Sequence, residues 1–381
     1  MNVIQLDSKW YLDAVRLSEY AFQYKVPEEK LEDNFRMMDK HHELYGILEG
    51  NELAAKLHFL PLEVFFAGKK VKMGGLAGVA TYPEYRRKGL VKDMLTFTLE
   101  KMKKEGYTLS MLHPFKVSFY RKYGWELFSR RLKSTLTSDD LAIQKRVPGS
   151  VKRYTKESHH SEIELLYDVF AEKFAGMLAR DREWWEQSVY NDNFTAVYYN
   201  AENQPKGYIL YQVKDRKMTV SEFVPLNEEA RHGLWNFICQ HDSMIKELEM
   251  VTHEHEPLFH ALPDPRFTAE TRPYFMARIV DAEAFLKEYE FKGKDILLNV
   301  TDDYAPWNTG SYLIRQGGTA KTEPVKEKGI NLSINSLAAI LFGYQTVSSL
   351  AEIGEITGDE EEIKRFEDSL PGNKPFFYDF F

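Results

Sequence analysis

The sequence predicts a mixed α/β protein with two related α/β segments and a smaller C-terminal α+β domain. Three observations predict this class. A strand pattern, a short basic loop and an amphipathic helix follow one another between residues 76 and 105, and a degraded copy recurs at residues 219–234. After residue 278 the pattern changes to short strands and helices. With 381 residues the chain exceeds what one core usually serves, so we expect domains at 1–145, 146–278 and 279–381.

Composition narrows the function classes. The hydrophobic fraction of 43% and the charged fraction of 28% are those of an ordinary soluble globular protein. A net charge of −8 argues against a general partner among nucleic acids or anionic membranes, and mildly suits a cationic substrate. The single cysteine, Cys239, excludes an intramolecular disulfide. The N-terminus lacks a signal-peptide pattern, and no apolar run approaches the ~20 residues of a membrane span, so we expect a cytoplasmic protein.

The first segment opens with helical patterns and continues with strands. Apolar residues at helical spacing predict an amphipathic helix over 8–24, and a second helix restarts after Pro27, because proline is tolerated in a first turn. Gly50-Asn51 and Gly68-Lys69-Lys70 supply the turns between three expected strands. These strands lie at residues 44–48, 53–66 and 71–81.

The basic loop after the third strand predicts a phosphate site. Pro83 blocks continuation of the strand, and three cations, Arg86, Arg87 and Lys88, lead into Gly89. A helix is expected from Leu90 to residue 105, and the unpaired N–H groups and dipole at its start attract anions. Glycine lets a ligand approach the backbone closely, so a pyrophosphate is the natural guest. A solvated basic turn would give the same short pattern.

The elements after this helix point to one superfamily. A strand is expected at residues 107–112, then a short helix at 118–123 that Gly124 ends as a C-cap. This element order, together with the spacing Arg86-x-x-Gly89, resembles the GCN5-related N-acetyltransferase (GNAT) superfamily. Val91 departs from the small residue that ends the superfamily's acetyl-CoA motif. The resemblance implies an acetyltransferase fold that binds acetyl-CoA.

The second segment is interpreted as a degenerate copy of the first. Residues 207–213 and 217–224 form a hairpin-like pair, and Gly233 stands where Gly89 does in the first copy. The triple cation has become Ala230-Arg231-His232, which loses much of the attraction for an anion. We therefore expect a decayed cofactor site that is retained for packing. The histidines of Thr252-His253-Glu254-His255 lack a metal-binding spacing, so no metal site is expected.

The third segment reads as a small α+β domain. Asp281 is a candidate N-cap for a helix over 282–289. Helices are also expected over 336–342, ended by Gly343, and from about Ser348. Strands are expected at residues 296–300, 311–315 and 331–334.

Two acetyltransferase-like segments followed by such a domain resemble the enhanced intracellular survival (Eis) protein family, whose third domain is similar to a sterol carrier protein fold. The resemblance implies an acetyl-CoA-dependent N-acetyltransferase that acts on cationic small molecules such as aminoglycosides or polyamines. It also implies a homo-oligomer, typically a hexamer, with acetyl-CoA as co-substrate and no metal. Two alternatives remain: a lipid- or sterol-binding protein that uses the C-terminal domain, and a non-catalytic CoA-sensing partner protein.

The family's functional positions fall on particular residues of this chain. Tyr120 matches the general acid, and Phe381, the last residue, matches the position whose terminal carboxylate is the general base. Phe22, Tyr24 and Asp379 are plausible contacts for an amine substrate, through cation–π or ion-pair interactions. The cofactor contacts implied are Val79, Ala80, Thr81, Arg86, Arg87, Lys88, Gly89, Leu90, Val91, Lys92, Phe115 and Lys116.

Acetyl transfer explains why these groups are needed. The attacking amine must lose a proton, the thioester oxygen gains negative charge, and CoA leaves as a thiolate that Tyr120 could protonate. An α-carboxyl with a pKa near ~3.5 is a feeble base in water, but burial among the aromatic residues of 375–381 would raise its pKa. Without the resemblance, the tail reads as a hydrophobic plug and Tyr120 as a core residue.

Overall fold

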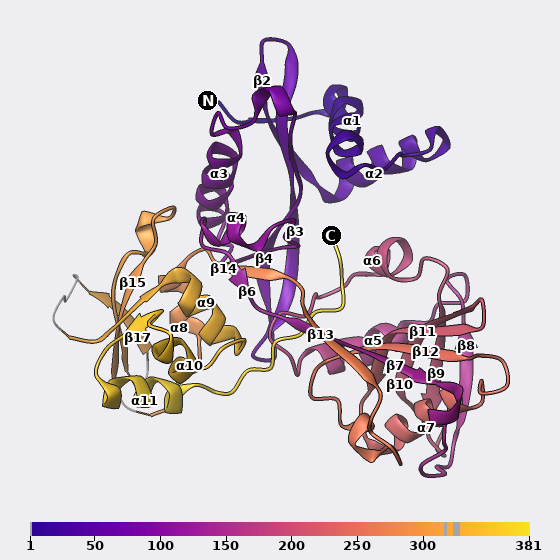
Figure 1. Ribbon diagram of the computed structural model, residues 1–381. Coiled ribbons are helices and arrows are strands. Elements are labelled where there is room, and N and C mark those ends of the chain that lie inside the picture. The colour runs from indigo at the N-terminus through magenta and orange to yellow at the C-terminus, as the bar shows by residue number, and fades with distance from the viewer. Residues whose placement is uncertain (1, 294, 316–317, 323–327) are drawn as a thin grey trace.

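A computed structural model describes residues 2–293, 295–315, 318–322 and 328–381. The strands of these residues form three sheets, and Figure 1 shows three lobes that meet at the centre of the molecule. Within the described ranges, no helix is long and apolar enough to cross a membrane.

The first sheet has the strand order β1-β2-β3-β4-β5-β14-β6, in which β4 and β5 are parallel. Its four helices are α1 (Tyr11–Phe22), α2 (Leu31–His41), α3 (Leu90–Lys104) and α4 (Val117–Arg121). These elements confirm the helices and strands expected for the first segment. The strands are β1 (Ile4–Gln5), β2 (Glu43–Glu49), β3 (Glu52–Phe66), β4 (Lys69–Thr81), β5 (Leu109–Leu112), β6 (Glu126–Leu127) and β14 (Met276–Ile279).

A bulge separates β3 from β4 in the middle of this sheet. Lys56 pairs with Ala80 and His58 with Ala77, so Gly78 and Val79 together oppose the single residue between Lys56 and His58. Gly78 has φ +54°, a backbone conformation that side chains rarely adopt. Such bulges disrupt the ladder locally and are frequent next to functional sites. Here the bulge opens the sheet beside two cavities.

The second sheet has the order β13-β7-β12-β11-β10-β9-β8 and carries α5 (Ser161–Ala171), α6 (Arg182–Trp184) and α7 (Glu228–Cys239). Its hairpin of β10 and β11 confirms the strand pair expected from the sequence. The strands are β7 (Arg130–Thr137), β8 (Ser150–Tyr154), β9 (Phe194–Tyr199), β10 (Pro205–Lys214), β11 (Lys217–Pro225), β12 (Glu247–Thr252) and β13 (Thr268–Pro273).

The chain crosses between the first two sheets. β7 precedes the boundary expected at residue 145 but pairs with β12 and β13 in the second sheet. β14 follows the second sheet in sequence, yet it pairs with β5 and β6 in the first. The boundaries themselves stay a prediction, and this exchange shows that neither sheet consists of one continuous segment.

The expected equivalence of Gly233 and Gly89 is wrong in register. Gly89 is the N-cap of α3, whereas α7 already begins at Glu228 with Asn227 as its N-cap, so Gly233 lies inside the helix. A side chain at Gly233 would lie 2.3 Å from the ring of Tyr198, which shows why a glycine stands there. Tyr198 donates a hydrogen bond to Glu229 on the same helix. Gly233 therefore serves helix–sheet packing rather than a phosphate.

The third sheet has the order β17-β16-β15-β18-β19, with α8 (Ala282–Glu288), α9 (Ile334–Phe342), α10 (Val347–Glu352) and α11 (Glu360–Ser369). Asp281 caps α8 and Gly343, with φ +85°, ends α9, as the sequence predicts. α9 is buried against β6 and β14 of the first sheet. The strands are β15 (Ile296–Thr301), β16 (Gly310–Arg315), β17 (Gly318–Thr322), β18 (Ile330–Ser333) and β19 (Ile356–Thr357).

Candidate active site

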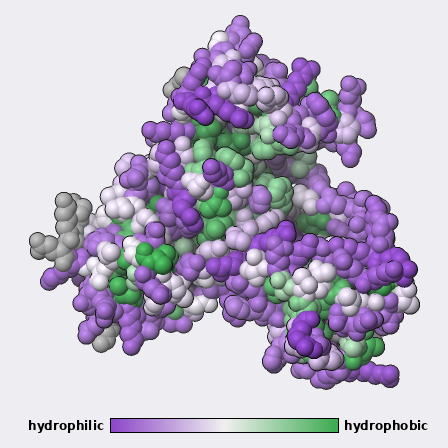
Figure 2. Space-filling model, in the orientation of Figure 1, coloured by the Kyte–Doolittle hydropathy of each residue, from purple (hydrophilic) through white to green (hydrophobic). Residues whose placement is uncertain are grey.

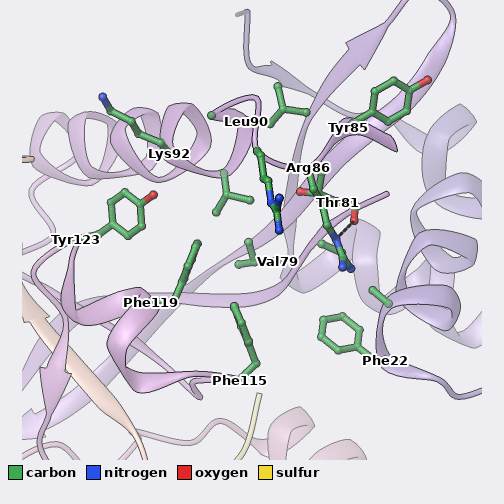
Figure 3. Close-up of a pocket in the computed structure, with 15 residues that line it drawn as sticks. Phe22, Val79, Thr81, Tyr85, Arg86, Leu90, Lys92, Phe115, Phe119 and Tyr123 are labelled. Carbon is green, nitrogen blue, oxygen red and sulfur yellow. Dashed lines mark hydrogen bonds between the residues drawn. The ribbon is translucent and has the colours of Figure 1, made fainter. Parts of the chain in front are cut away.

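A cavity of about 630 Å³, here called the loop cavity, lies between the end of β4 and the start of α3. Figure 3 shows Lys92 and Tyr123 at one end of it and Arg86 and Phe22 at the other. All of the cofactor contacts expected from the sequence line this cavity except Lys88 and Lys116. The structure therefore brings most of the expected residues to one place.

The start of α3 is suited to hold a phosphate. Gly89 adopts φ +85°, and a Cβ added there would meet no atom within 4 Å, so the backbone is open to close approach. The N-cap residue Gly89 has no side chain with which to cap this helix start, and the first N–H groups of a helix attract anions. Arg86 Nε donates to the carbonyl of Thr81 at 3.4 Å, and Lys88 Nζ lies 4.9 Å from the ring centre of Tyr85.

A second cavity of about 520 Å³, the tail cavity, adjoins the first, and Phe22, Val79 and Phe115 line both. The end of the chain lies in this cavity with Phe380 and Phe381. In Figure 1 the yellow tail runs from α11 across the molecule and ends near β3, and Figure 2 shows hydrophobic residues in the central hollow. Tyr24, Tyr120 and Gly78, which lies in the bulge of β4, also line the tail cavity.

Tyr120 lies in the wall of the tail cavity on α4. Its side chain is buried, and burial raises its pKa, so the phenol stays protonated at neutral pH. The ring makes edge-to-face contacts with Phe115 and Phe119 at 5.5 and 5.2 Å. No described residue forms a hydrogen bond with its hydroxyl. The proton is therefore available to a ligand in the cavity.

Arginine and tyrosine side chains fix the path of the tail. The Arg131 guanidinium donates to the carbonyls of Phe377, at 3.1 Å, and of Tyr378, and it stacks on the ring of Tyr274 with 3.4 Å between the guanidinium carbon and the ring centre. Tyr274 donates to the carbonyl of Asp379 at 2.9 Å. Phe377 is fully buried in the core. These contacts leave little freedom to the residues that precede Phe381.

Asp379 does not contact the cavity, which corrects the substrate role expected for it. Its carboxylate is buried and accepts hydrogen bonds from Arg180 Nε at 2.9 Å and from Trp184 Nε1 at 2.8 Å. Arg180 also pairs with the buried Glu222. An aspartate enclosed by these partners anchors the tail to the second lobe and is unavailable to an amine. Phe22 and Tyr24, by contrast, do line the tail cavity.

A row of basic side chains that was not predicted from the sequence lines the tail cavity. Lys56 is fully buried, and its Nζ lies 2.7 Å from His58 Nε2. His58 Nδ1 in turn lies 2.9 Å from His42 Nδ1. Burial lowers the pKa of Lys56 to about 7 and that of His42, which also faces Lys56 and His41, to about 4. Side chains alternate along a strand, so Lys56 and His58 lie on one face of β3. The row was not evident from the sequence, because a lysine in a strand is normally expected at the surface.

Replacing Lys56 should stabilise the protein, and the gain should depend on pH. A lysine whose pKa falls from 10.5 unfolded to about 7 folded destabilises the native state fully below pH 7. This penalty, about 5 kcal/mol at most, disappears as the pH rises from 7 to 10.5. Urea unfolding of Lys56→Met should show a gain of a few kcal/mol at pH 6 that shrinks at pH 9. A gain that is equal at both pH values would contradict the assignment.

Family models match all three parts of the chain. Acetyltransferase (GNAT) domain models match residues 2–128 and 176–279, and a sterol carrier protein domain model matches residues 282–378. The chain is thus a tandem GNAT acetyltransferase with a C-terminal domain of the sterol carrier type. A GNAT fold implies acetyl-CoA as co-substrate, which agrees with the loop cavity.

Several relatives are similar to this chain over most of its length. N-acetyltransferase Eis from Mycobacterium tuberculosis is 24% identical over 358 residues, covering 87% of this chain and 86% of that protein. A probable N-acyltransferase from Enterococcus faecalis has a solved structure with 27% identity and a TM-score of 0.92, covering 100% of this chain and 99% of that one. Eis1 from Mycobacterium abscessus, at 18% identity and a TM-score of 0.85 over both full chains, shares the fold. The chain is an N-acetyltransferase homologous to Eis.

Proposed function

We propose that this protein transfers the acetyl group of acetyl-CoA directly to the amine of a small molecule, and that the reaction takes place where its two cavities meet. The observation that carries the proposal is the contact between the cavities at Val79, beside the bulge of β4. A pyrophosphate at the start of α3 would direct a pantetheine arm along β4 toward this point. The amine would approach from the tail cavity.

Two groups in the tail cavity are suited to the proton transfers. We assign Tyr120 as the general acid that protonates the departing CoA sulfur, because its phenol is protonated and its hydroxyl has no partner among the described residues. We assign the carboxylate of Phe381 as the general base, since the tail holds Phe381 in the same cavity. Backbone N–H groups near Val79 and Ala80 would stabilise the developing oxyanion.

The residues that line the tail cavity indicate which kind of acceptor amine fits it. Its aromatic and methionine side chains, among them Phe22, Tyr24 and Met37, suit an amine with an apolar body. Among the residues that the structure describes, no aspartate or glutamate side chain lines this cavity. An aminoglycoside- or polyamine-like acceptor remains a proposal, and a monoamine with an aromatic or aliphatic body fits this lining better than a polycation.

The activity can be tested by the release of free thiol. The protein is mixed with acetyl-CoA and a panel of monoamines, polyamines and aminoglycosides, and thiol is measured against a protein-free blank. We expect turnover with at least one amine and a preference for monoamines with apolar bodies. Tight CoA binding without turnover across the panel would contradict the proposal and support the CoA-sensing alternative.

The cationic loop should contribute mainly to binding of the cofactor. Arg87→Ala is expected to raise the Kd of acetyl-CoA about 10-fold, because a charged contact with phosphate is worth about 1.5–3 kcal/mol. The loss should shrink at high salt, where the contact is already screened. Lys116→Ala is the matched control, since Lys116 is exposed and does not line the loop cavity. Titration calorimetry that gives equal Kd values for both variants would contradict the assignment.

The lipid-binding alternative has less support. α9, the most apolar helix of the C-terminal domain, packs against β6 and β14 of the first lobe and does not face a cavity there among the described residues. Side chains of the first and third lobes form one continuous core there. The homo-oligomer expected from the resemblance stays a prediction.

A further inference from the structure

We propose that Lys56, His58 and His42 form a proton relay that removes a proton from the acceptor amine in the tail cavity. The inference rests on the proposed acetyl transfer and adds a second proton path to it, distinct from the carboxylate of Phe381. No acidic group takes part in the relay. His42 is the catalytic residue of the three, since it is placed to meet the substrate, and Lys56 and His58 act through it.

The three side chains form an unbroken row from the sheet to the cavity. Lys56 and His58 lie two residues apart on β3 and so share one face of the strand. His42, which follows α2 as its C-cap residue, completes the row at 2.9 Å from His58. Lys56 and His58 are buried, whereas His42 is partly exposed. The row thus leads from a buried amine to the open part of the cavity.

The bulge of β4 makes room for this row. A Cβ built on Gly78 would lie 2.8 Å from Lys56 Nζ and 2.8 Å from the His58 ring. Lys56 Nζ therefore lies against the bulge, and both line the tail cavity. The only hydrogen-bond partner described for it is His58.

The hydrogen-bond pattern allows two proton arrangements. When Lys56 is charged it donates to His58 Nε2; His58 then donates from Nδ1 to His42, and His42 presents an N–H to the cavity. When Lys56 is neutral, every bond can reverse: His58 Nε2–H donates to the lysine lone pair, and His42 Nδ1–H donates to His58. His42 then presents a bare Nε2 to the cavity, which can accept a proton.

Transfer through the row converts one arrangement into the other. An acceptor ammonium gives its proton to His42 Nε2, the Nδ1 proton of His42 moves to His58 Nδ1, and the Nε2 proton of His58 moves to Lys56 Nζ. The amine gains its lone pair, and the net proton rests on Lys56. After the product leaves, the proton returns by the same route to His42 and to water.

The reaction requires two proton acceptors. An ammonium that becomes an amide sheds two protons: one before attack and one as the tetrahedral intermediate collapses. The relay takes the first, and the carboxylate of Phe381 takes the second. Tyr120 donates its own proton to the CoA sulfur and recovers one from Phe381, so that the free thiol and one released proton balance the reaction.

Burial keeps Lys56 able to accept a proton. Burial lowers its pKa, and burial together with the neighbouring Lys56 and His42 holds the pKa of His58 well below its usual range. The other titratable groups that line the tail cavity with the row are His113, whose pKa burial lowers, Tyr24, Tyr120 and the end of the chain at Phe381. Beside His42, His41 pairs with Glu183 at 3.1 Å.

The test compares amines of different basicity. The best amine of the panel and its β,β-difluoro analogue, whose amine is less basic by several pKa units, are assayed with wild type, His42→Asn and Lys56→Met at pH 8. The strongly basic amine arrives charged and needs the relay, so both variants should lose about 10- to 100-fold in kcat with it. The loss should be several-fold smaller with the fluorinated amine, which arrives neutral. His41→Asn is the matched control outside the cavity.

The pH profile supplies a second readout. With wild type and the strongly basic amine, kcat/KM should rise as the pH passes about 7, because only neutral Lys56 can accept a proton. Lys56→Met should lose this rise of kcat/KM with pH. Added imidazole should restore part of the rate of His42→Ala. Equal losses for the two amines, or an unchanged rise in Lys56→Met, would overturn the relay. Absence of turnover in wild type would instead reject the proposed function.

Discussion

A single glycine added after Phe381 should lower kcat about 100- to 1000-fold, while the Kd of acetyl-CoA changes less than about twofold. The extension moves the carboxylate away from the acceptor and leaves a neutral peptide group in its place. General-base catalysis is typically worth 10²–10⁴ in rate, which sets the size of the effect. Acetyl-CoA binding should persist because the loop cavity lies on the other side of Val79.

Phe381→Leu is the matched control for this extension. It keeps a terminal carboxylate and changes only the ring, so we expect it to retain most of kcat. Arg131 and Tyr274 hold the backbone of residues 377–379 in both variants, so the tail should stay docked. Steady-state kinetics in which the glycine-extended protein keeps more than about a tenth of the wild-type kcat would show that the carboxylate is not the base.

Tyr120→Phe should lower kcat about 100-fold with unfolding behaviour close to that of wild type. The variant removes the proton that the CoA sulfur would take, while the ring contacts with Phe115 and Phe119 remain. Since the hydroxyl has no partner within the described part of the chain, little stability is lost with it.

Tyr107→Phe, which removes another phenol in the same lobe at a site lining neither cavity, is the control for Tyr120→Phe. Thiol release and thermal melts are measured for both variants. Wild-type turnover in Tyr120→Phe would remove this residue as the acid. A large drop in Tm would instead show that the hydroxyl has a structural role.

Most of the fold could be predicted from local sequence patterns. Strands β2 to β5 and helices α1 and α3 follow directly from periodicity and turn residues, and the caps at Asp281 and Gly343 were readable because their chemistry is local. The exchange of β7 and β14 was not readable. Which sheet a strand joins depends on pairing with segments more than a hundred residues away, and a single sequence does not encode that choice locally.

α11 shows a different limit. It consists mainly of charged residues, and only Phe366 and Ser369 of its length are buried. A helix with so narrow an apolar stripe gives a weak periodic signal. Its N-cap Asp359, followed by three glutamates, was the one signal that could have located it.

The part of the site that is built from sequence motifs could be predicted. The loop residues and Tyr120 follow from the element order and the resemblance. Asp379 was assigned wrongly, because its partner Arg180 belongs to the second lobe. No residue close to Asp379 in the sequence indicates this ion pair. Lys56 was missed for the opposite reason: a lysine in a strand is expected at the surface, and only the bulge at Gly78 explains how its amine is enclosed.

Rapid-quench single turnover tests direct transfer most closely. Protein loaded with radiolabelled acetyl-CoA is mixed with the best amine of the panel, and label is followed in acetyl-CoA, protein and product. Direct attack in the joined cavities predicts that label passes from acetyl-CoA to the N-acetyl product in one phase and never accumulates on the protein. Label that appears on the protein before the product forms, or no labelled amine at all, would contradict the account.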